Sequence, residues 1–110
     1  MPSYSKNEVV LVRYPFSDLS NSKIRPAVII NSPHVSQDVI IVALTSRTVS
    51  LLAGEFTLTE WKSAGLNIET AVKRGIFTIN RKLIIKSVGK LSATDSRNLD
   101  RSLRDWMDLQ

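Results

Sequence analysis

Short apolar runs separated by turn-forming residues constrain the fold of this chain more than any other feature. Six runs rich in apolar and β-branched residues are typical of strands: Val9–Tyr14, Val28–Ile30, Val39–Leu44, Phe56–Leu58, Thr70–Ile79 and Leu83–Leu91. The sequence predicts no helix of crossover length between them, which disfavours a parallel sheet. We therefore expect a mainly β (α+β) fold, a small mixed β-barrel with short helices, in which the run at 39–44 is central.

The end of the chain carries the pattern of an amphipathic helix. The segment Ser92–Asp95 has a capping-box pattern, which marks a helix N-terminus. Four large apolar residues follow at the spacing of one helix face: Leu99, Leu103, Trp106 and Met107. A shorter helical turn, capped by Thr57 or Thr59, is expected at 60–64, with Gly65 as its end.

Length and composition exclude several classes of protein. The 110 residues are expected to form one domain, over residues 1–110. No apolar run is longer than the six residues Val39–Leu44, so we expect no membrane span, and the N-terminus has no signal-peptide pattern. Cysteine is absent, which excludes disulfides, thiolate catalysis and cysteine–zinc sites and is consistent with the cytoplasm.

The net charge of +5 is unevenly distributed. Between Lys73 and Lys90 the chain has six basic residues and no acidic one. A positive field of this kind concentrates polyanions, nucleic acid first among them. A solvated basic face with no ligand is the alternative, and charge alone does not separate the two.

Arg25 and Thr45 are the strongest candidates for a binding site. Pro26 has no backbone N–H, fits the first residue of a strand and would hold Arg25 extended at the mouth of that strand. The donor fork of a guanidinium matches a phosphate. Thr45 and Ser46 leave the end of the next strand, so antiparallel pairing would bring the guanidinium and the hydroxyls to one rim. The alternatives are a surface arginine paired with a carboxylate and a threonine that satisfies a turn amide.

Other catalytic arrangements find little support. His34 is the only histidine and lies in a turn beside Pro33. This excludes a histidine-pair ribonuclease mechanism and a histidine-rich metal site. No G-x-S-x-G motif occurs. Trp61 and Trp106 are expected to pack in or beside the core, with stacking on nucleobases as the alternative.

The order of several short motifs is more specific than any motif alone. The segments Glu8–Val12, Pro15–Leu19, Arg25–Ile29 and Ala43–Ser46 together resemble the first half of the MazF/PemK family. These proteins are the ribonuclease toxins of bacterial toxin–antitoxin pairs. The later segments Glu60–Leu66 and Val88–Ser92 are similar to landmarks of its PemK-like branch, so the resemblance covers about residues 8–106.

This resemblance implies a fold, an activity and partners. The fold would be an SH3-like barrel with a C-terminal helix, working as a homodimer in the cytoplasm. The activity would be sequence-selective cleavage of single-stranded RNA, including mRNA, without a metal or other cofactor. Attack by the 2′-OH would leave 2′,3′-cyclic phosphate and 5′-OH ends and arrest growth. A cognate antitoxin would block the site, any contact with operator DNA would come only through that antitoxin, and no membrane would be involved.

The family's catalytic arginine and threonine fall on Arg25 and Thr45. Ser46 is a weaker candidate to orient the phosphate, and the candidates for RNA binding are basic: Lys23, Arg47, Lys73, Arg74 and Lys82. Many members carry an acidic residue where this chain has Lys73-Arg74-Gly75, so the general base is open and Asp18 is a candidate for it. Two further functions stay possible. One is a toxin of the same fold that inhibits gyrase without cutting RNA, and the other is a non-catalytic RNA-binding module.

Overall fold

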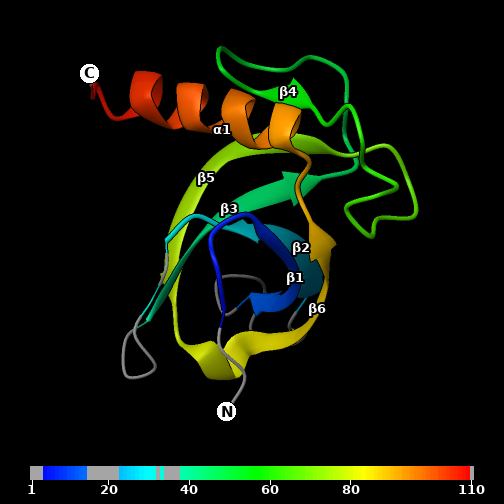
Figure 1. Cartoon of the computed structure of the whole chain (residues 1–110), viewed down its shortest axis with the longest axis vertical. Helices are drawn as coiled ribbons and strands as arrows, with labels where there is room; N and C mark the ends of the chain where they lie inside the picture. The colour runs from blue at the N-terminus through cyan, green and yellow to red at the C-terminus, as the bar shows by residue number, and fades with distance from the viewer. Residues whose placement is uncertain (1–3, 15–22, 32, 34–37, 110) are drawn as a thin grey trace.

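Six antiparallel strands form one strongly curled sheet in the computed structural model, which describes residues 4–14, 23–31, 33 and 38–109 (Figure 1). Along the sheet the strand order is β4-β5-β3-β2-β1-β6. In chain order the elements are β1 (Glu8–Tyr14), β2 (Lys23–Ile29), β3 (Val39–Thr45), β4 (Phe56–Thr57), β5 (Ala71–Ile79), the 3₁₀ turn η1 (Arg81–Leu83), β6 (Ile84–Lys90) and α1 (Ala93–Trp106). The predicted antiparallel β architecture with a C-terminal helix is confirmed.

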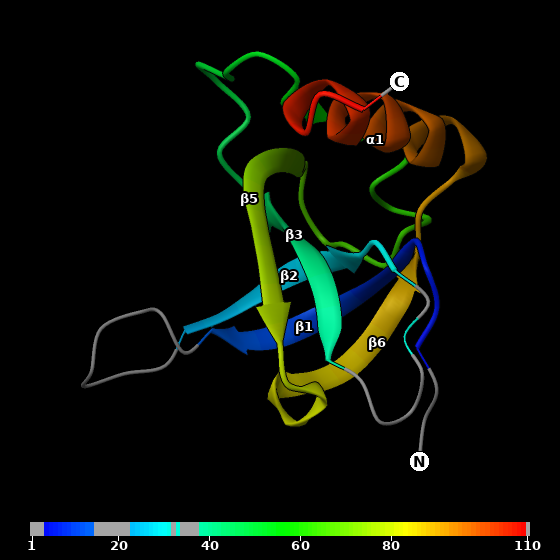
Figure 2. The same cartoon turned by 90° about the vertical axis from the view of Figure 1, so that its left-hand side faces the viewer.

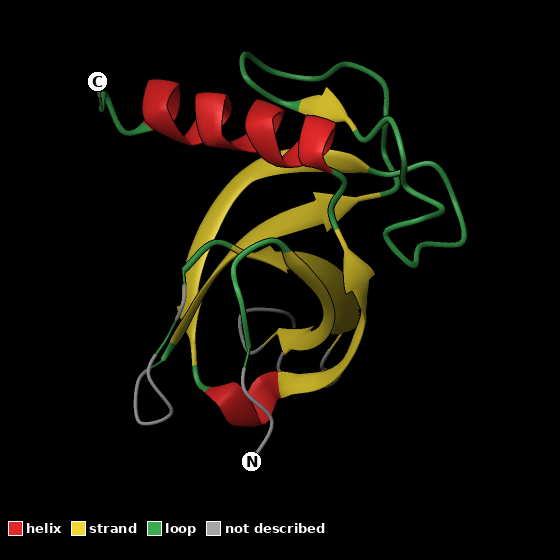
Figure 3. Ribbon diagram, viewed as in Figure 1, coloured by secondary structure: helices red, strands yellow, loops and turns green. Residues whose placement is uncertain are grey.

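The sheet is curled but not closed. Its end strands are β4 and β6, and within the described residues no pairing joins β6 to β4 or β5. Figure 2 shows β5 and β6 on either side of β3, with β1 and β2 crossing behind β5. The turn η1 connects β5 to β6 at the end of the sheet away from α1 (Figure 3). The predicted barrel is therefore barrel-like only in its curvature.

The central strands are buried on both faces, which explains their continuous apolar runs. Val9, Val28 and Val42 pack in one cluster with the helix residues Leu99 and Leu103. Their sequence neighbours Val10, Ile29 and Ile41 pack in a second cluster inside the curl. Side chains alternate between faces along a strand, so a strand with a core on each side needs an apolar residue at every position.

Helix α1 lies across one end of the sheet, as its apolar spacing predicts (Figure 1). Leu99 and Leu103 are buried and Trp106 is half-buried, whereas Met107 follows the last helical turn and is exposed. Both tryptophans, Trp61 and Trp106, pack against the core, as expected. None of the helices in the described part of the chain is long and apolar enough to span a membrane.

The capping box at the start of α1 is formed only in part. Ser92 Oγ accepts a hydrogen bond from Asp95 N at 3.1 Å, as predicted. The buried Asp95 carboxylate accepts instead from Thr59 N, Thr59 Oγ1 and Glu60 N, at 3.0, 3.0 and 3.1 Å. Asp95 thereby fixes the turn over residues 59–65, where the sequence suggested a short helix, to the first turn of α1.

Pro26 lies inside β2 and not at its first residue, which corrects the sequence prediction. β2 begins at Lys23 and pairs with β1 from that residue onward. Its pairing with β3 begins only at Ala27, opposite Ala43. Arg25 is therefore the third residue of the strand, at the point where one side of β2 has a partner and the other does not.

The missing N–H of Pro26 explains why the β2–β3 ladder ends there. Ile30 N donates to Ile40 O at 3.0 Å, and backbone groups alternate sides along a strand, so position 26 also faces β3. The register would place Leu44 opposite Pro26, but proline has no N–H to donate. A proline in this sheet is tolerated because it marks the end of pairing on one side.

A bulge of three residues in β5 faces the end of β3. Val42 pairs with Ile76 and Leu44 with Val72, so residues 73–75 lie opposite Ala43 alone. Additional residues in one strand bend it and turn their side chains to new directions. The segment Lys73-Arg74-Gly75, singled out in the sequence for its charge, is this bulge.

Candidate functional site

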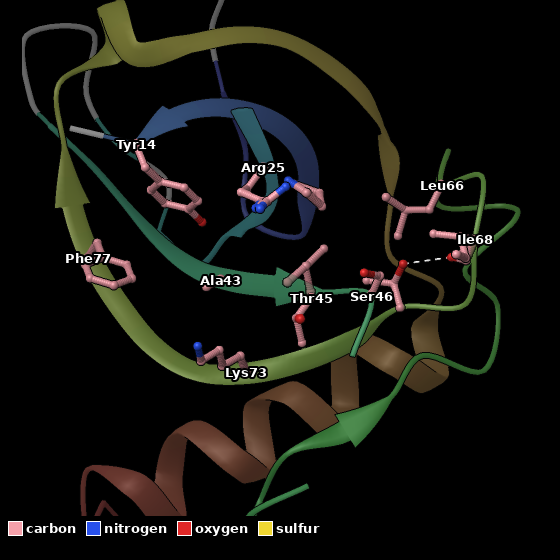
Figure 4. Close-up of a pocket in the computed structure, with 12 residues that line it drawn as sticks. Tyr14, Arg25, Ala43, Thr45, Ser46, Leu66, Ile68, Lys73 and Phe77 are labelled. Carbon is pink, nitrogen blue, oxygen red and sulfur yellow. Dashed lines mark hydrogen bonds between the residues drawn. The ribbon is translucent and has the colours of Figure 1, made fainter. Parts of the chain in front are cut away.

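A pocket of about 480 Å³ lies on the concave side of the sheet, between the ends of β2, β3 and β5 (Figure 4). Its polar wall consists of hydroxyl-bearing and cationic residues: Tyr14, Arg25, Thr45, Ser46, Thr70 and Lys73. Its apolar wall consists of Pro26, Ala43, Leu44, Leu66, Ile68 and Phe77. Of the nine predicted site residues, four therefore come together in this pocket.

Arg25 and Thr45 lie on the same side of this pocket because their strands are antiparallel neighbours. Continuing the register of Ala27 opposite Ala43 places Arg25 opposite Thr45, two residues beyond the last pair. The pairing of β2 with β3 ends at Pro26, so the space between these two side chains is open. The juxtaposition predicted from the sequence is present, although it comes from the middle of β2 and not from its mouth.

Thr45 also makes the turn contact that the sequence offered as its alternative role. Its Oγ1 accepts a hydrogen bond from Arg47 N at 3.1 Å. A hydroxyl that accepts one hydrogen bond keeps its own proton for donation. The turn amide therefore fixes the oxygen, and the O–H can still donate to a bound group.

The electrostatics of the pocket favour an anion. Arg25 and Lys73 contribute two cations, and the residues described along the wall include no carboxylate. Lys73 reaches the pocket from the β5 bulge, whereas Arg25 reaches it from β2 (Figure 4). Two cations on opposite walls, with hydroxyl donors between them, form a plausible site for a phosphate group.

Tyr14 was not predicted as a site residue. It ends β1, and its ring meets Phe77 of β5 at a centroid separation of 5.9 Å and an interplanar angle of 59°. Burial raises the pKa of Tyr14 to about 12, against a smaller opposing effect of the nearby Arg25 charge. The hydroxyl therefore stays protonated at ordinary pH. Only the curl of the sheet brings β1 and β5 together, so no local sequence signal could have shown this contact.

The other predicted residues lie elsewhere. Arg47 lines a second pocket, beside the first. Lys23 begins β2, Arg74 lies in the bulge and Lys82 lies in η1, and none of the three lines either pocket. Asp18 and His34 fall outside the described residues. Within the described residues no group of three or more His, Asp or Glu could hold a metal ion.

The second pocket, of about 230 Å³, shares Thr45 and Lys73 with the first. Its remaining wall is the segment after β3: Arg47, Val49, Ser50, Leu51, Leu52 and Glu55. Glu55 Oε1 accepts from Leu52 N at 2.7 Å, and Glu55 Oε2 accepts from Arg74 N at 2.9 Å. These backbone bonds, that from Arg74 first, lower the pKa of the Glu55 carboxyl, and the charges of Lys73 and Arg74 add to the effect.

Comparison with solved structures shows the class of fold to which this sheet and pocket belong. MazF (Form-I) from Deinococcus radiodurans superposes with a TM-score of 0.79 at 14% identity, over 99% of this chain and 100% of that one. An endoribonuclease in complex with its cognate antitoxin, from a mycobacterial species, gives 0.75 at 14% identity, over 98% of each chain. The Mycobacterium tuberculosis toxin MazF-mt6 gives 0.71 at 21% identity, over 94% and 98%. The fold is that of the MazF toxins.

Sequence comparison then identifies the family. The model of the PemK-like, MazF-like toxins of type II toxin–antitoxin systems matches residues 5–107. The chain belongs to this family, as the order of its motifs indicated. A search of curated protein sequences finds no significant match.

Proposed function

We propose that this toxin is an endoribonuclease that cleaves single-stranded RNA by attack of a ribose 2′-OH on its own 3′-phosphate, without a metal. The observation that supports the proposal most is the convergence of Arg25, Lys73 and the Thr45 hydroxyl on one pocket. Such a pocket suits a phosphate whose negative charge grows during the reaction. The similarity to a mycobacterial endoribonuclease is consistent with it.

Each polar group has a distinct role in this mechanism. Attack forms a bond from the 2′-oxygen to phosphorus and breaks the bond to the 5′-oxygen. The 2′-OH gives its proton to a base and the leaving 5′-oxygen takes one from solvent water, which leaves a 2′,3′-cyclic phosphate and a 5′-OH. Arg25, with Lys73, stabilises the charge on the phosphoryl oxygens, because a guanidinium holds its proton too tightly to act as a general acid. Thr45, with Ser46 beside it, orients the phosphate by hydrogen bonding.

A carboxylate is the simplest acceptor for the 2′-OH proton. None lines the first pocket in the part of the chain that the structure describes. Asp18 belongs to the segment that joins Tyr14 to Lys23, the two ends of the strands beside Arg25. We therefore assign the role of proton acceptor to Asp18. Asp18→Asn should lower the rate of cleavage without loss of RNA binding, and an unchanged rate would remove this assignment.

The proposed partners follow from charge. The positive pocket suits mRNA as substrate and an acidic segment of a cognate antitoxin as its blocker, with operator DNA reached only through the antitoxin. We also propose a homodimer, for which light scattering of the purified chain is the test, and a stable monomer at micromolar concentration would contradict it.

The test of the activity combines chemistry with substitutions. RNA oligonucleotides are incubated with the protein in excess EDTA, and the fragment ends are analysed. We expect 2′,3′-cyclic phosphate and 5′-OH ends, and no cleavage when the attacking 2′-OH is replaced by hydrogen. Cleavage of the 2′-deoxy substrate would exclude this mechanism. Growth arrest without any RNA cleavage would favour a gyrase-type toxin, and RNA binding with neither effect would favour a non-catalytic RNA-binding module.

Substitutions at the pocket test the assigned residues. Arg25 is exposed, so Arg25→Ala should fold normally and lose a factor of about 10² or more in rate, as loss of a charge-stabilising donor does. Arg25→Lys, which keeps the charge but not the fork, should recover part of the rate. Thr45→Val should lose less, and Thr45→Ser, which keeps the hydroxyl, should stay near the wild-type rate. Equal rates for Val and Ser at position 45 would leave Thr45 with its turn contact alone.

A further inference from the structure

The second pocket has the size and lining for one ring system. Its volume of about 230 Å³ is below the roughly 300 to 1,000 Å³ of pockets that hold drug-sized ligands. Val49 and Leu52, on its wall, leave 67% and 68% of their surface exposed. A flat heterocycle would cover this apolar surface. Because Thr45 and Lys73 belong to both pockets, a nucleotide with its phosphate in the first pocket can place a neighbouring base in the second.

Glu55 is the carboxylate that the described residues place on the wall of this second pocket. Two backbone N–H groups, those of Leu52 and Arg74, fix its orientation. Each oxygen of a carboxylate has two lone-pair sites, so a group that accepts one bond per oxygen can accept more. A fixed anion repels a phosphate, so a neutral ligand with N–H donors suits this wall better.

We propose that Glu55 selects the base next to the scissile phosphate by accepting a hydrogen bond from its exocyclic amino group. An ionised carboxylate accepts and cannot donate, so it favours cytosine, adenine or guanine over uracil, which presents a carbonyl oxygen at the place of the cytosine amino group. This inference rests on the proposed action on RNA and adds the residue that sets its sequence preference.

Glu55 also has a structural role, which the test must separate from base selection. It ties the segment before β4 to the β5 bulge through Leu52 and Arg74. Helix α1 holds the same segment independently: Ser102 Oγ donates to Gly54 O at 2.7 Å, and Trp106 Nε1 donates to Ala53 O at 2.9 Å. Ser102 does not line the pocket, so Ser102→Ala loosens this segment without changing the groups that face a base.

The experiment compares bases that differ only by the amino group. Short RNAs, each with one 2′-deoxy substitution at the scissile nucleotide to prevent cleavage, are varied at one flanking position, and their dissociation constants are measured. The preferred base is then replaced by its analogue without the amino group: 2-pyrimidinone for cytosine, purine for adenine or hypoxanthine for guanine. For the wild type we expect the analogue to bind at least about tenfold more weakly, since a hydrogen bond to a charged group is lost.

Two protein variants complete the comparison of the parent base with its analogue. In Glu55→Gln the preference for the parent base over the analogue should shrink, because a neutral amide oxygen is a weaker acceptor than a carboxylate and the amide nitrogen cannot accept. Ser102→Ala should keep the full preference of the wild type. Equal binding of the two bases by the wild type overturns the proposal, even if E55Q fails to fold. A preference that E55Q keeps undiminished overturns it as well. Failure of the nuclease proposal would show separately, because this experiment measures binding. In that case the wild-type protein would bind these RNAs but would cut none of their all-ribose counterparts.

Discussion

At the scale of single residues, one side chain can combine a structural and a functional role. Thr45 closes the turn after β3 through Arg47 N and also faces the candidate phosphate site. The contact that satisfies the turn amide is the contact that holds the hydroxyl oxygen in place. A strand-end threonine is therefore consistent with both interpretations of the sequence, and only a substitution separates them.

The raised pKa of Tyr14 predicts a loss of stability at high pH. Folding raises this pKa from 10.0 to about 12, so the folded state keeps the phenol proton where the unfolded chain has lost it. The contribution of the protonated Tyr14 phenol to the free energy of unfolding is complete below pH 10 and is lost as pH rises through about 12. The free energy of unfolding should therefore fall more steeply over this range for the wild type than for Tyr14→Phe, by at most about 2.7 kcal/mol in total. Chemical denaturation at several pH values measures the difference, and parallel pH profiles would contradict it.

The residues of the pocket were predictable to different degrees. Arg25 and Thr45 could be found because strand ends and a proline are local signals, and neighbouring strands bring such ends together. Lys73 was singled out only as part of a charged segment, since nothing in its sequence shows that a bulge turns it toward Arg25. Tyr14 and Glu55 were missed because their positions depend on the curl of the sheet and on the turn before β4.

At the scale of elements, the turn at 59–65 packs against β6 with almost no space between the two backbones. Gly65 has φ +88°, which L side chains rarely adopt, and a Cβ there would collide with the Val88 carbonyl oxygen. Gly75, in the β5 bulge, has an ordinary φ, and its Cβ would meet the edge of the Phe77 ring at 3.1 Å. A ring edge can shift, whereas a backbone carbonyl in a strand cannot.

This contrast predicts unequal effects of two matched glycine substitutions. Gly65→Ala should lower the free energy of unfolding by at least about 2 kcal/mol, because it combines backbone strain with a backbone collision. Gly75→Ala should cost less than about 1 kcal/mol. Denaturant titration of both variants measures the values. Similar losses at the two positions would mean that the close approach of the turn to β6 is not a determinant of stability.

The sequence did not predict the strand order, although it predicted the strands themselves and a barrel-like curvature. Alternating or continuous apolar runs located five strands to within one residue at each end, because burial on one or both faces determines these patterns. The run at 28–30 covers only the end of β2, which begins at Lys23. The start of β2 was misplaced at Pro26, since β2 pairs with β1 from Lys23 but with β3 only from Ala27. The second half of the capping box was wrong because Asp95 found donors in a segment far away in the sequence.

At the scale of the whole molecule, exposed basic pairs occur both in the β5 bulge and on α1. Lys73 and Arg74 occupy the β5 bulge, and Arg97 and Arg101 are exposed on α1. Attraction of a polyanion depends on total charge, but release of counterions depends on which cations touch phosphates. The two pairs therefore offer a comparison at equal net charge.

Neutralising the bulge pair should reduce the salt dependence of RNA binding. For a single strand the slope of log K against log salt changes by about 0.7 for each phosphate that a cation no longer neutralises. We expect Lys73→Gln with Arg74→Gln to flatten the slope by up to about 1.4, and Arg97→Gln with Arg101→Gln to leave it nearly unchanged. Titration of a fluorescent RNA at several salt concentrations gives both slopes. A flatter slope in the helix variant would place the path of the RNA over α1.

We expect the proline at the end of the β2–β3 ladder to determine how wide the candidate site can open. Without an N–H at position 26, the β2–β3 ladder stops short of Arg25 and Thr45, and we expect the unpaired stretch to serve as the entrance for a ligand. Pro26→Ala restores a donor that faces Leu44 and would let the ladder advance into that entrance. The gain of a hydrogen bond and the loss of a rigid residue nearly cancel, so stability should change by less than about 1 kcal/mol. Activity on RNA should nevertheless fall, as the aperture narrows. We therefore expect the missing hydrogen bond to be a condition for access of RNA, and a chain with a more regular sheet to be a weaker toxin.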